Sequence, residues 1–324
     1  MSDLHLATNI YHKPDYDPIR KGFGRGLLEA GRRDERVVAL CADLTSSTQI
    51  NMFADAFPER FVQVGVAEQN LVTVGSGLAA QGKIPFVSSY AAFSPGRNWE
   101  QIRTTICLND RPVKIIGSHA GLYTGADGAT HQMLEDIALM RVLPNMVVIV
   151  PGDSLESEKA TLAMAIDKRP NYLRVAREAT PILTTKDTPF EIGKAYVYAE
   201  GTDLTIISTG TMTYHALIAA ERLFSTGIDA EVVHVPTIKP LDGVTILKSV
   251  HKTKHVLTIE EAQINGGLGG AVAELLGEEF PVPIKRLGMR DRFGESGEPA
   301  ELLEHFGLTA KHIMIAAHDL VKKA

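Results

Sequence analysis

One glutamate lies within a long run of small and apolar residues. The stretch FVQVGVAEQNLVTVGSGLAAQG, residues 61–82, contains Glu68 as its one acid. Burying a carboxylate among apolar side chains is costly unless the carboxylate has a partner. This run therefore raises the question of which partner Glu68 serves.

A loop rich in glycine carries two histidines. The segment SHAGLYTGADGATHQ, residues 118–132, contains His119, Asp127 and His131 after an expected strand. Glycine lets a backbone approach a ligand closely or adopt positive φ. We favour a small-molecule site here over a plain surface loop. A metal site ranks third, because the histidines lack the usual ligand spacing and no CxxC, HExxH or EF-hand pattern occurs in the sequence.

Aromatic and basic residues near the ends of expected elements give weaker signals. Tyr90 and Phe93 directly follow an expected strand. Such a pair usually packs in a core, but it can also stack on a planar heteroaromatic ring. Arg20, Ser47 and Arg177 each lie at an element edge, where a single arginine is most often a surface charge. Two arginines that converge would instead bind a phosphate through their guanidinium forks.

The segment GGLGG, residues 266–270, has two possible interpretations. It could be the start of a dinucleotide-binding loop or a close-packed helix start. The third glycine of GxGxxG would fall at position 272, which is Val. This departure favours the helix start.

Composition limits the class of protein. The chain has 324 residues, of which 44% are apolar and 22% charged, enough for two α/β domains. The net charge of −6 gives no reason to expect nucleic acid as a partner. No apolar run reaches membrane-spanning length and the N-terminus lacks a signal core, so we predict a cytoplasmic protein with no membrane partner. Cys41 and Cys107 should be free thiols.

Strand-like and helical patterns alternate along the chain, which predicts an α/β fold with two doubly wound, mostly parallel sheets. A linker is expected at 180–195, so the predicted domains are 15–185 and a smaller one at 195–324. Sites in such sheets lie at the carboxyl ends of the strands. The polar residues that follow expected strands there are Asp43, Ser89, His119, Asp153 and Arg177. The strands are expected at 36–44, 60–66, 83–90, 112–121, 146–153 and 171–178, and then at 203–210, 229–236, 254–261 and 282–289.

Four motifs together resemble one family. GVAEQN, GADGATHQ, MRVLPNMVVIVPGD and DRFGESG are similar to the C-terminal half of transketolase. The resemblance runs from about Arg20 to the end, and it covers a pyrimidine-binding domain and a C-terminal domain. Deoxyxylulose-phosphate synthase and the β subunits of 2-oxoacid dehydrogenases share GVAEQ and DGATHQ in similar form, but DRFGESG is more like transketolase.

The resemblance implies a role for each candidate residue. Thiamine diphosphate would be the cofactor, and Glu68 would share a proton with a nitrogen of its pyrimidine ring. Tyr90 and Phe93 would stack around that ring, and Asp43 would support the cofactor region between subunits. His131 would act with Glu68 in catalysis and contact the sugar. Asp127 would bind a substrate hydroxyl, and the phosphate of the acceptor would be bound by Arg20, Ser47, His119 and Arg177. Arg97 and Trp99 have no firm counterpart, because SPGRNW departs from the full-length enzymes.

One departure predicts a partner subunit. Full-length transketolases carry an N-terminal domain with GDG followed by NN, which binds the diphosphate and a divalent metal. This sequence has ADG at 126–128 and no NN, and we expect no such domain before Arg20. The resemblance thus implies one subunit of a split transketolase of the pentose phosphate pathway, moving a two-carbon ketol unit from a ketose phosphate to an aldose phosphate. An N-terminal subunit would hold the diphosphate with Mg²⁺ or Ca²⁺, and a heterotetramer is expected.

Several alternatives remain open. The chain could serve a transketolase-type step on an unusual, branched sugar phosphate. A subunit similar to deoxyxylulose-phosphate synthase or to a dehydrogenase β chain is less favoured. A non-catalytic paralogue should have lost Glu68 or His131, and both are present.

Overall fold

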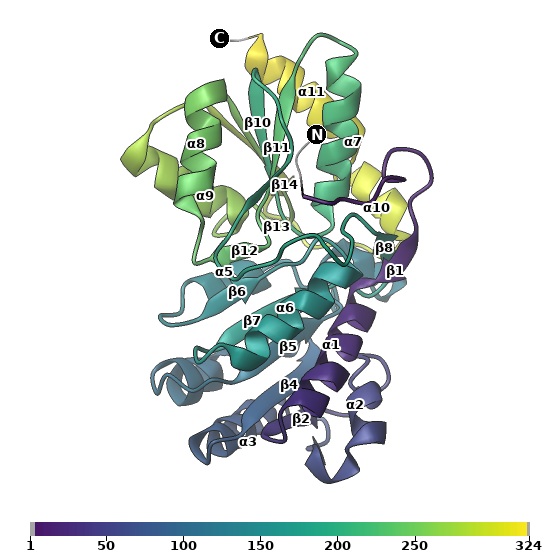
Figure 1. The fold of residues 1–324 in the computed structure, drawn as a ribbon, viewed down its shortest axis with the longest axis vertical. Helices are drawn as coiled ribbons and strands as arrows, with labels where there is room; N and C mark the ends of the chain where they lie inside the picture. The colour runs from purple at the N-terminus through teal and green to yellow at the C-terminus, as the bar shows by residue number, and fades with distance from the viewer. Residues whose placement is uncertain (1–3, 323–324) are drawn as a thin grey trace.

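Two main β-sheets, one above the other along the long axis, organise the computed structural model (Figure 1). The structure describes residues 4–322. Strands and helices alternate through both sheets, which confirms the predicted α/β fold. Within residues 4–322, no helix combines the length and the apolar character needed to cross a bilayer.

The first sheet has seven strands in the order β12-β6-β7-β5-β4-β2-β3. All neighbours are parallel except β12, Thr237–Lys239, which comes from the C-terminal half and runs antiparallel to β6. β2 and β5 are buried along their whole length, as expected for strands covered on both faces. The six strands predicted for this sheet are present, mostly with shorter bounds: β2 Val37–Cys41, β3 Phe61–Gln63, β4 Ile84–Tyr90, β5 Lys114–Ser118, β6 Val147–Ile149 and β7 Asn171–Val175.

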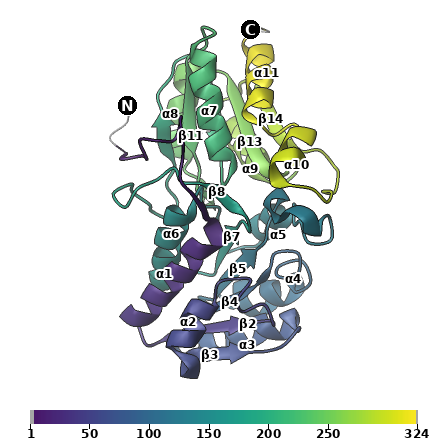
Figure 2. The ribbon, with the colours of Figure 1, turned by 90° about the vertical axis from the view of Figure 1, so that its right-hand side faces the viewer.

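Helices cover both faces of this sheet. Alternate residues of one strand enter different apolar clusters, because successive strand side chains point to opposite faces. Ala39 belongs to the cluster that contains Phe23 of α1, whereas Leu40 belongs to the cluster that contains Leu71 of α3. Figure 2 shows α1 and α6 on one side of the strands and α4 on the other. The helices are α1 Ile19–Arg33, α2 Asn51–Ala56, η1 Pro58–Arg60, α3 Glu68–Ala80, α4 Trp99–Gln101, the π-helical η2 Ile102–Cys107, η3 Leu122–Asp127, α5 Asp136–Arg141 and α6 Ser154–Ile166.

The second sheet has five strands in the order β14-β13-β10-β11-β9, and only β9 is antiparallel to its neighbour. Its strands are β9 Tyr196–Ala199, β10 Leu204–Ser208, β11 Ala230–His234, β13 Val256–Gln263 and β14 Ile284–Met289. The helices of this half are α7 Met212–Phe224, α8 Gly243–Thr253, α9 Leu268–Glu279, α10 Pro299–His305 and α11 Ala310–Val321. Gly267 is the N-cap of α9, so GGLGG is a helix start, as predicted.

A short antiparallel pair joins the beginning of the chain to the end of β7. β1, Tyr16–Pro18, pairs with β8, Ala179–Pro181. β8 overlaps the start of the predicted linker at 180–195, so the first residues of that segment are paired strand. The pairing holds the first turn of α1 beside the residues that follow β7.

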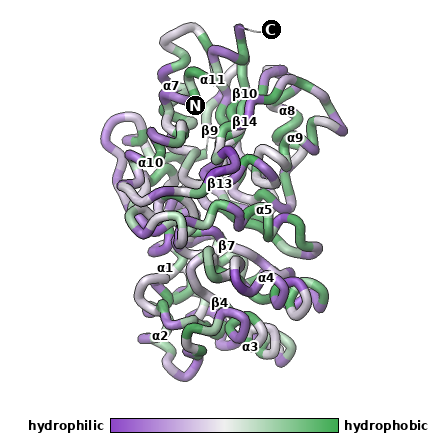
Figure 3. Tube along the Cα trace, turned by 180° about the vertical axis from the view of Figure 1, so that it is seen from behind, coloured by the Kyte–Doolittle hydropathy of each residue, from purple (hydrophilic) through white to green (hydrophobic). Residues whose placement is uncertain are grey.

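Among the covering helices, α1 is amphipathic: Phe23 and Leu27 are buried, whereas Arg32 and Arg33 are exposed. Figure 3 shows both polar and apolar segments in the region of α3. Cys41 and Cys107 are buried and free, as predicted. Burial raises the pKa of the Cys107 thiol to about 11, so this thiol stays protonated and unreactive at neutral pH.

Candidate active site

The carboxyl ends of four neighbouring strands bring candidate residues to one edge of the first sheet. β7, β5, β4 and β2 are adjacent and parallel. Arg177, His119, Tyr90 and Asp43 lie at or just after these ends. The structure therefore places them at the edge where parallel sheets bind ligands. Asp153 has a different task, because it is buried and its Oδ1 accepts from the backbone N–H of Glu156 at 2.8 Å as the N-cap of α6.

Glu68 is the first residue of α3 and is 1% exposed. Its Oε2 accepts a hydrogen bond from Arg97 Nη1 at 2.6 Å, and its Oε1 lies 3.5 Å from the hydroxyl of Ser89. Asn98 Nδ2 donates to the backbone carbonyl of Glu68 at 2.8 Å. The position at a helix N-terminus also favours negative charge. The acid in the apolar run is thus buried, paired and held in place.

A cavity of about 520 Å³ opens beside Glu68. Arg97, whose side chain is 50% exposed, forms part of its wall. The side-chain oxygen of Gln101, also in the wall, is buried and has no hydrogen-bond partner among the described residues. The lining residues are Val66, Ala67, Glu68, Gln69, Asn70, Thr73, Arg97 and Gln101.

An aromatic cluster lies on the far side of Arg97. The guanidinium carbon of Arg97 is 5.0 Å from the ring centroid of Phe93. The rings of Phe93 and Tyr90 are 5.9 Å apart and nearly parallel. The ring of Tyr90 also stacks on that of His119, with 3.7 Å between the ring centroids. The rings of His131 and Phe93 meet edge-on, with 5.5 Å between their centroids. Both aromatic residues are partly exposed, so they form an open face of the site and are not sealed in a core.

His119 is held in its neutral form. Its φ of 55° lies in the left-handed region, and its ring is buried with Nδ1 2.9 Å from the hydroxyl of Ser118. Burial, followed by the charges of Arg20 and Arg177, lowers the pKa of His119 to about 3. His119 therefore offers a neutral imidazole to any ligand at physiological pH.

Two arginines converge at the same edge. Arg20 Nε donates to the carbonyl of Arg177 at 2.9 Å, and Arg20 Nη1 donates to the carbonyl of Ser47 at 2.6 Å. Arg177 Nη1 lies 3.4 Å from a carboxylate oxygen of Asp127. Burial and the charge of Arg177 lower the pKa of Arg20. Two guanidiniums placed close together have the charge and the donors that suit an anion with several oxygens.

The remaining predicted residues differ in their setting. Asp43 is exposed at the end of β2 with φ of 60°, and its N–H donates to Gln63 Oε1 at 2.8 Å. Trp99 has a structural contact, since its Nε1 donates to the carbonyl of Leu139 at 2.8 Å. The contacts of Arg97 and Asn98 with Glu68 were not predicted. Their only sequence signal was that both lie in SPGRNW, next to the aromatic pair.

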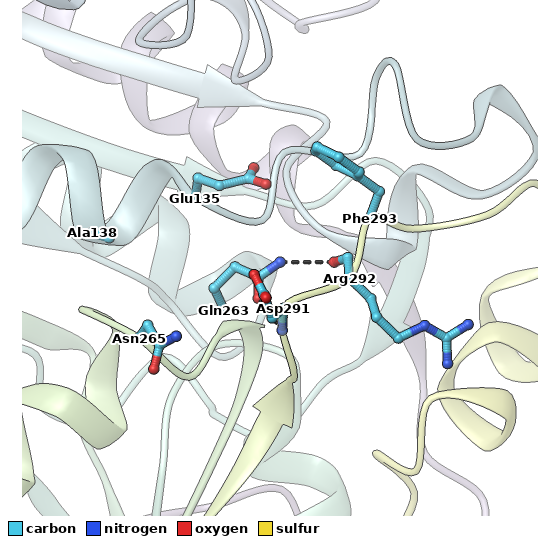
Figure 4. Close-up of a pocket in the computed structure, with 7 residues that line it drawn as sticks. All are labelled: Glu135, Ala138, Gln263, Asn265, Asp291, Arg292 and Phe293. Atoms are coloured by element: carbon cyan, nitrogen blue, oxygen red, sulfur yellow. Dashed lines mark hydrogen bonds between the residues drawn. The ribbon is translucent and has the colours of Figure 1, made fainter.

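A second cavity, of about 240 Å³, lies between α5 and the DRFGESG segment (Figure 4). Gln263 at the end of β13 donates from Nε2 to the carbonyl of Arg292 at 2.8 Å. No predicted site residue lines this cavity, whose lining is Glu135, Ala138, Gln263, Asn265, Asp291, Arg292 and Phe293. The cavity lies where elements of the two halves of the molecule meet.

Two family descriptions match nearly the whole chain. Residues 18–182 match "Transketolase, pyrimidine binding domain", and residues 193–313 match "Transketolase, C-terminal domain". The chain belongs to the transketolase family. It is a transketolase-type subunit, a transferase, as the four sequence motifs indicated.

Several similar proteins are comparable to this chain in length. This transketolase-family chain is 45% identical over 311 residues to a putative transketolase C-terminal section from Methanocaldococcus jannaschii, covering 95% of this chain and 98% of that protein. It is 43% identical over 297 residues to a 6-deoxy-6-sulfo-D-fructose transketolase subunit from Clostridium sp., covering 92% of each. A solved structure described as a split gene transketolase, inactive β4 tetramer, superposes with a TM-score of 0.88 at 44% identity, covering 94% of this chain and 98% of that one.

Proposed function

We propose that this chain is the C-terminal subunit of a split, thiamine-diphosphate-dependent transketolase that moves a two-carbon ketol unit from a ketose phosphate to an aldose phosphate. The observation that carries the proposal is the setting of Glu68. This buried carboxylate borders a cavity and bonds Arg97, which lies over Phe93 of the aromatic cluster. His119 of that cluster is close enough to Arg20 and Arg177 for their charges to lower its pKa. Ketol transfer between sugar phosphates needs a proton-sharing acid and an anion site next to each other.

The residues around the cavity fit the aminopyrimidine half of the cofactor. Glu68 offers the carboxylate oxygen Oε1, whose distance to the hydroxyl of Ser89 is at the limit of hydrogen bonding. Gln101 offers a side-chain oxygen that has no hydrogen-bond partner among the described residues. Tyr90 and Phe93 offer partly exposed ring faces. Thiamine diphosphate, when bound, supplies a carbanion at its thiazolium carbon and an electron sink. Glu68 would share a proton with the pyrimidine through Oε1, and the aromatic pair would orient the ring and exclude water.

The convergent arginines fit the phosphate end of the sugar. Arg20 and Arg177 would supply the charge, while Ser47 and the neutral His119 would add hydrogen bonds. Asp127 would contact a substrate hydroxyl. His131, which is less buried than His119, would contact the sugar in the channel and move protons there.

A partner subunit completes the proposed site. An N-terminal transketolase subunit would hold the diphosphate together with Mg²⁺ or Ca²⁺, and Asp43, exposed at the end of β2, would support the cofactor at the junction. The β4 tetramer of the related split transketolase supports self-association, here as a dimer within a heterotetramer. We place the protein in the cytoplasm and in the pentose phosphate pathway, with functional units at 15–185 and 195–324.

The direct test combines the purified chain with a diphosphate-binding transketolase subunit, thiamine diphosphate and Mg²⁺. Transfer from xylulose 5-phosphate to ribose 5-phosphate is then followed by product formation. The chain alone should be inactive, and the complex should transfer. A complex that assembles but transfers with neither sugar would overturn the proposal.

A second candidate differs only in the sugar. Relatives include the 6-deoxy-6-sulfo-D-fructose subunit and, at 38% identity, one subunit of an apulose-4-phosphate transketolase from Phocaeicola vulgatus. Paired arginines bind any tetrahedral oxyanion, so a sulfonate or a branched sugar phosphate also suits them. Comparing kcat/KM for xylulose 5-phosphate, apulose 4-phosphate and the sulfosugar decides between the candidates. Subunits similar to deoxyxylulose-phosphate synthase or to a dehydrogenase β chain remain less favoured.

A further inference from the structure

The loop that carries His119, Asp127 and His131 closes on itself at a narrow neck. We call residues 119–132 the site loop. Ala120 forms an isolated bridge with Met133, and the N–H of Gly121 donates to the carbonyl of Met133 at 2.8 Å. Whatever holds this neck also sets where the three candidate substrate residues lie.

A carboxylate from the second sheet holds the neck. Glu261 lies on β13 and is 3% exposed. Its Oε1 accepts from the N–H of Tyr123 at 2.8 Å, and its Oε2 accepts from the hydroxyl of Thr211 at 2.6 Å. Gly121, with φ of 77°, lies so close that a Cβ there would overlap with Oε1 of Glu261. The neck is therefore built around this side chain.

The same contact reaches the anion site. The carbonyl of Thr124, one residue beyond Tyr123, accepts from Arg177 Nη1 at 2.9 Å. Arg177 Nη1 also lies 3.4 Å from Asp127. A shift of the backbone at Tyr123 would thus move both the carbonyl that orients Arg177 and the carboxylate beside it.

Burial raises the pKa of the Glu261 carboxyl, and the nearby charge of Arg174 partly opposes this effect. Arg174 is buried on β7, and its Nη2 donates to the backbone carbonyl of Glu261 at 2.9 Å. Its Nε pairs with Asp136 at 2.9 Å. This network joins the two sheets behind the site loop. Removing one partner of such a buried polar contact would lower the free energy of unfolding substantially.

The second sheet also holds the other arm of the site loop. Gln263, two residues beyond Glu261, bonds the N–H of Asp291 at 3.1 Å and the carbonyl of Arg292 at 2.8 Å (Figure 4). The carbonyl of Glu295 in the same segment accepts from Gln132 Nε2 at 2.8 Å. The end of β13 thus contacts one arm directly and the other through DRFGESG.

We propose that Glu261 is a positioning residue for the sugar-phosphate site: it fixes the neck of the site loop so that Arg177, Asp127 and His131 meet the substrate together. The inference rests on the proposed function. It gives the C-terminal domain a task in substrate binding, although that domain contributes none of the predicted substrate ligands.

The test compares Glu261→Ala with Glu260→Ala in the reconstituted complex. Glu260 is the neighbouring buried acid on β13, but its carboxylate accepts from the N–H groups of Leu268 and Gly269 in α9. We expect Glu261→Ala to raise KM for the sugar phosphates by about tenfold or more with a smaller change in kcat, because a misplaced positioning group mainly impairs binding geometry. Glu260→Ala should leave KM within about twofold, since its contacts lie away from the site loop.

Two further variants keep the test decisive. Glu261→Gln retains an acceptor for Tyr123 and should restore KM toward the wild-type value. If Glu261→Ala does not fold, Glu261→Asp takes its place, because the shorter side chain withdraws the carboxylate from Tyr123. In the chain alone, hydrogen exchange of the Tyr123 amide should accelerate in Glu261→Ala and not in Glu260→Ala.

The outcomes separate the two claims. An active wild-type complex in which Glu261→Ala leaves KM unchanged, or in which Glu260→Ala raises it equally, overturns the positioning role and leaves the proposed function intact. A wild-type complex that assembles without ketol transfer overturns the proposed function and the inference with it.

Discussion

Two buried glutamates, one from each half of the molecule, lie at the N-terminus of a helix and have opposite settings. Glu260, on β13, accepts from the backbone N–H groups of Leu268 and Gly269 at 2.7 and 2.8 Å, the first turn of α9. Glu68, the first residue of α3, has its carboxylate bonded by side chains, the hydroxyl of Ser89 and the half-exposed Arg97, and it borders a cavity.

The difference indicates how to separate a structural acid from a functional one. The backbone donors of Glu260 are fixed by the helix, so its carboxylate has no freedom to serve a ligand. The partners of Glu68 are side chains that can move, so its carboxylate can exchange one of them for a ligand.

The largest effect should come from removing Glu68. We expect Glu68→Ala to lower kcat of ketol transfer in the reconstituted complex by about a hundredfold or more, because proton transfer by a positioned group contributes factors of that order. Glu260→Ala should lower the free energy of unfolding while leaving kcat nearly unchanged. If folded Glu68→Ala and Glu260→Ala lost kcat equally, the two acids would not differ in function as we expect.

The next effect concerns the proposed anion site at the edge of the first sheet. Arg177→Ala should raise KM for a sugar phosphate by roughly tenfold to a hundredfold, because a charge-assisted hydrogen bond contributes about 1.5–3 kcal/mol. Steady-state kinetics with the phosphorylated sugar measures this change. Arg33→Ala is the matched control, since Arg33 is an exposed arginine of α1 that pairs with Glu29. An Arg177→Ala complex with unchanged KM would remove Arg177 from the site.

A smaller effect should appear as a pH dependence of stability. Burial raises the pKa of Glu260 from 4.5 to about 7. A carboxyl group whose pKa is raised in the folded state contributes stability that is complete below about pH 4.5 and is lost as the pH rises through about 7. Each pKa unit of difference between the folded and unfolded states corresponds to about 1.4 kcal/mol in the free energy of unfolding. Urea unfolding between pH 4.5 and 8 should therefore show a decline that Glu260→Gln flattens. Parallel pH profiles for wild type and variant would refute this.

The smallest expected effect is a change in the pKa of His119. Because the pKa of His119 is lowered to about 3 by burial and by Arg20 and Arg177, its ring should not titrate between pH 5.5 and 8 in NMR spectra. Removing one of these charges in Arg20→Ala should move the pKa of His119 upward toward 6.5. An unshifted His119 in this variant would show that the arginines do not set its charge state.

Much of this fold could be predicted from the sequence. The buried strand β2 is a continuous apolar run and the other central strands are rich in apolar residues, and their alternation with helical segments indicates a parallel sheet. Some of the shortest strands were not predicted, although the edge strands β3 and β14 were. β12 has only three residues and pairs with β6, which is distant in the sequence, and β1 and β8 consist of three residues each. Such strands exist because of tertiary pairing and carry no periodic signal of their own.

The meeting of several candidate residues at one sheet edge was predictable, and their individual contacts were less so. His119 and Arg177 follow buried strands and Tyr90 is the last residue of one, so their meeting at one edge follows from the parallel order. The bond between Arg97 and Glu68 depends on how the turn after β4 folds back on α3, and the bond between Glu261 and Tyr123 joins two different sheets. Contacts of this kind depend on packing between elements, which local sequence patterns do not encode.

The central claim is that Glu68 shares a proton with the cofactor, and its most direct test measures one proton. Exchange of the thiazolium proton of thiamine diphosphate with deuterium oxide can be followed by quench-flow and NMR in the reconstituted complex without any sugar. If Glu68 has this role, Glu68→Gln slows the exchange by about a hundredfold or more while the cofactor remains bound. Exchange at the wild-type rate in the loaded Glu68→Gln complex would contradict the account.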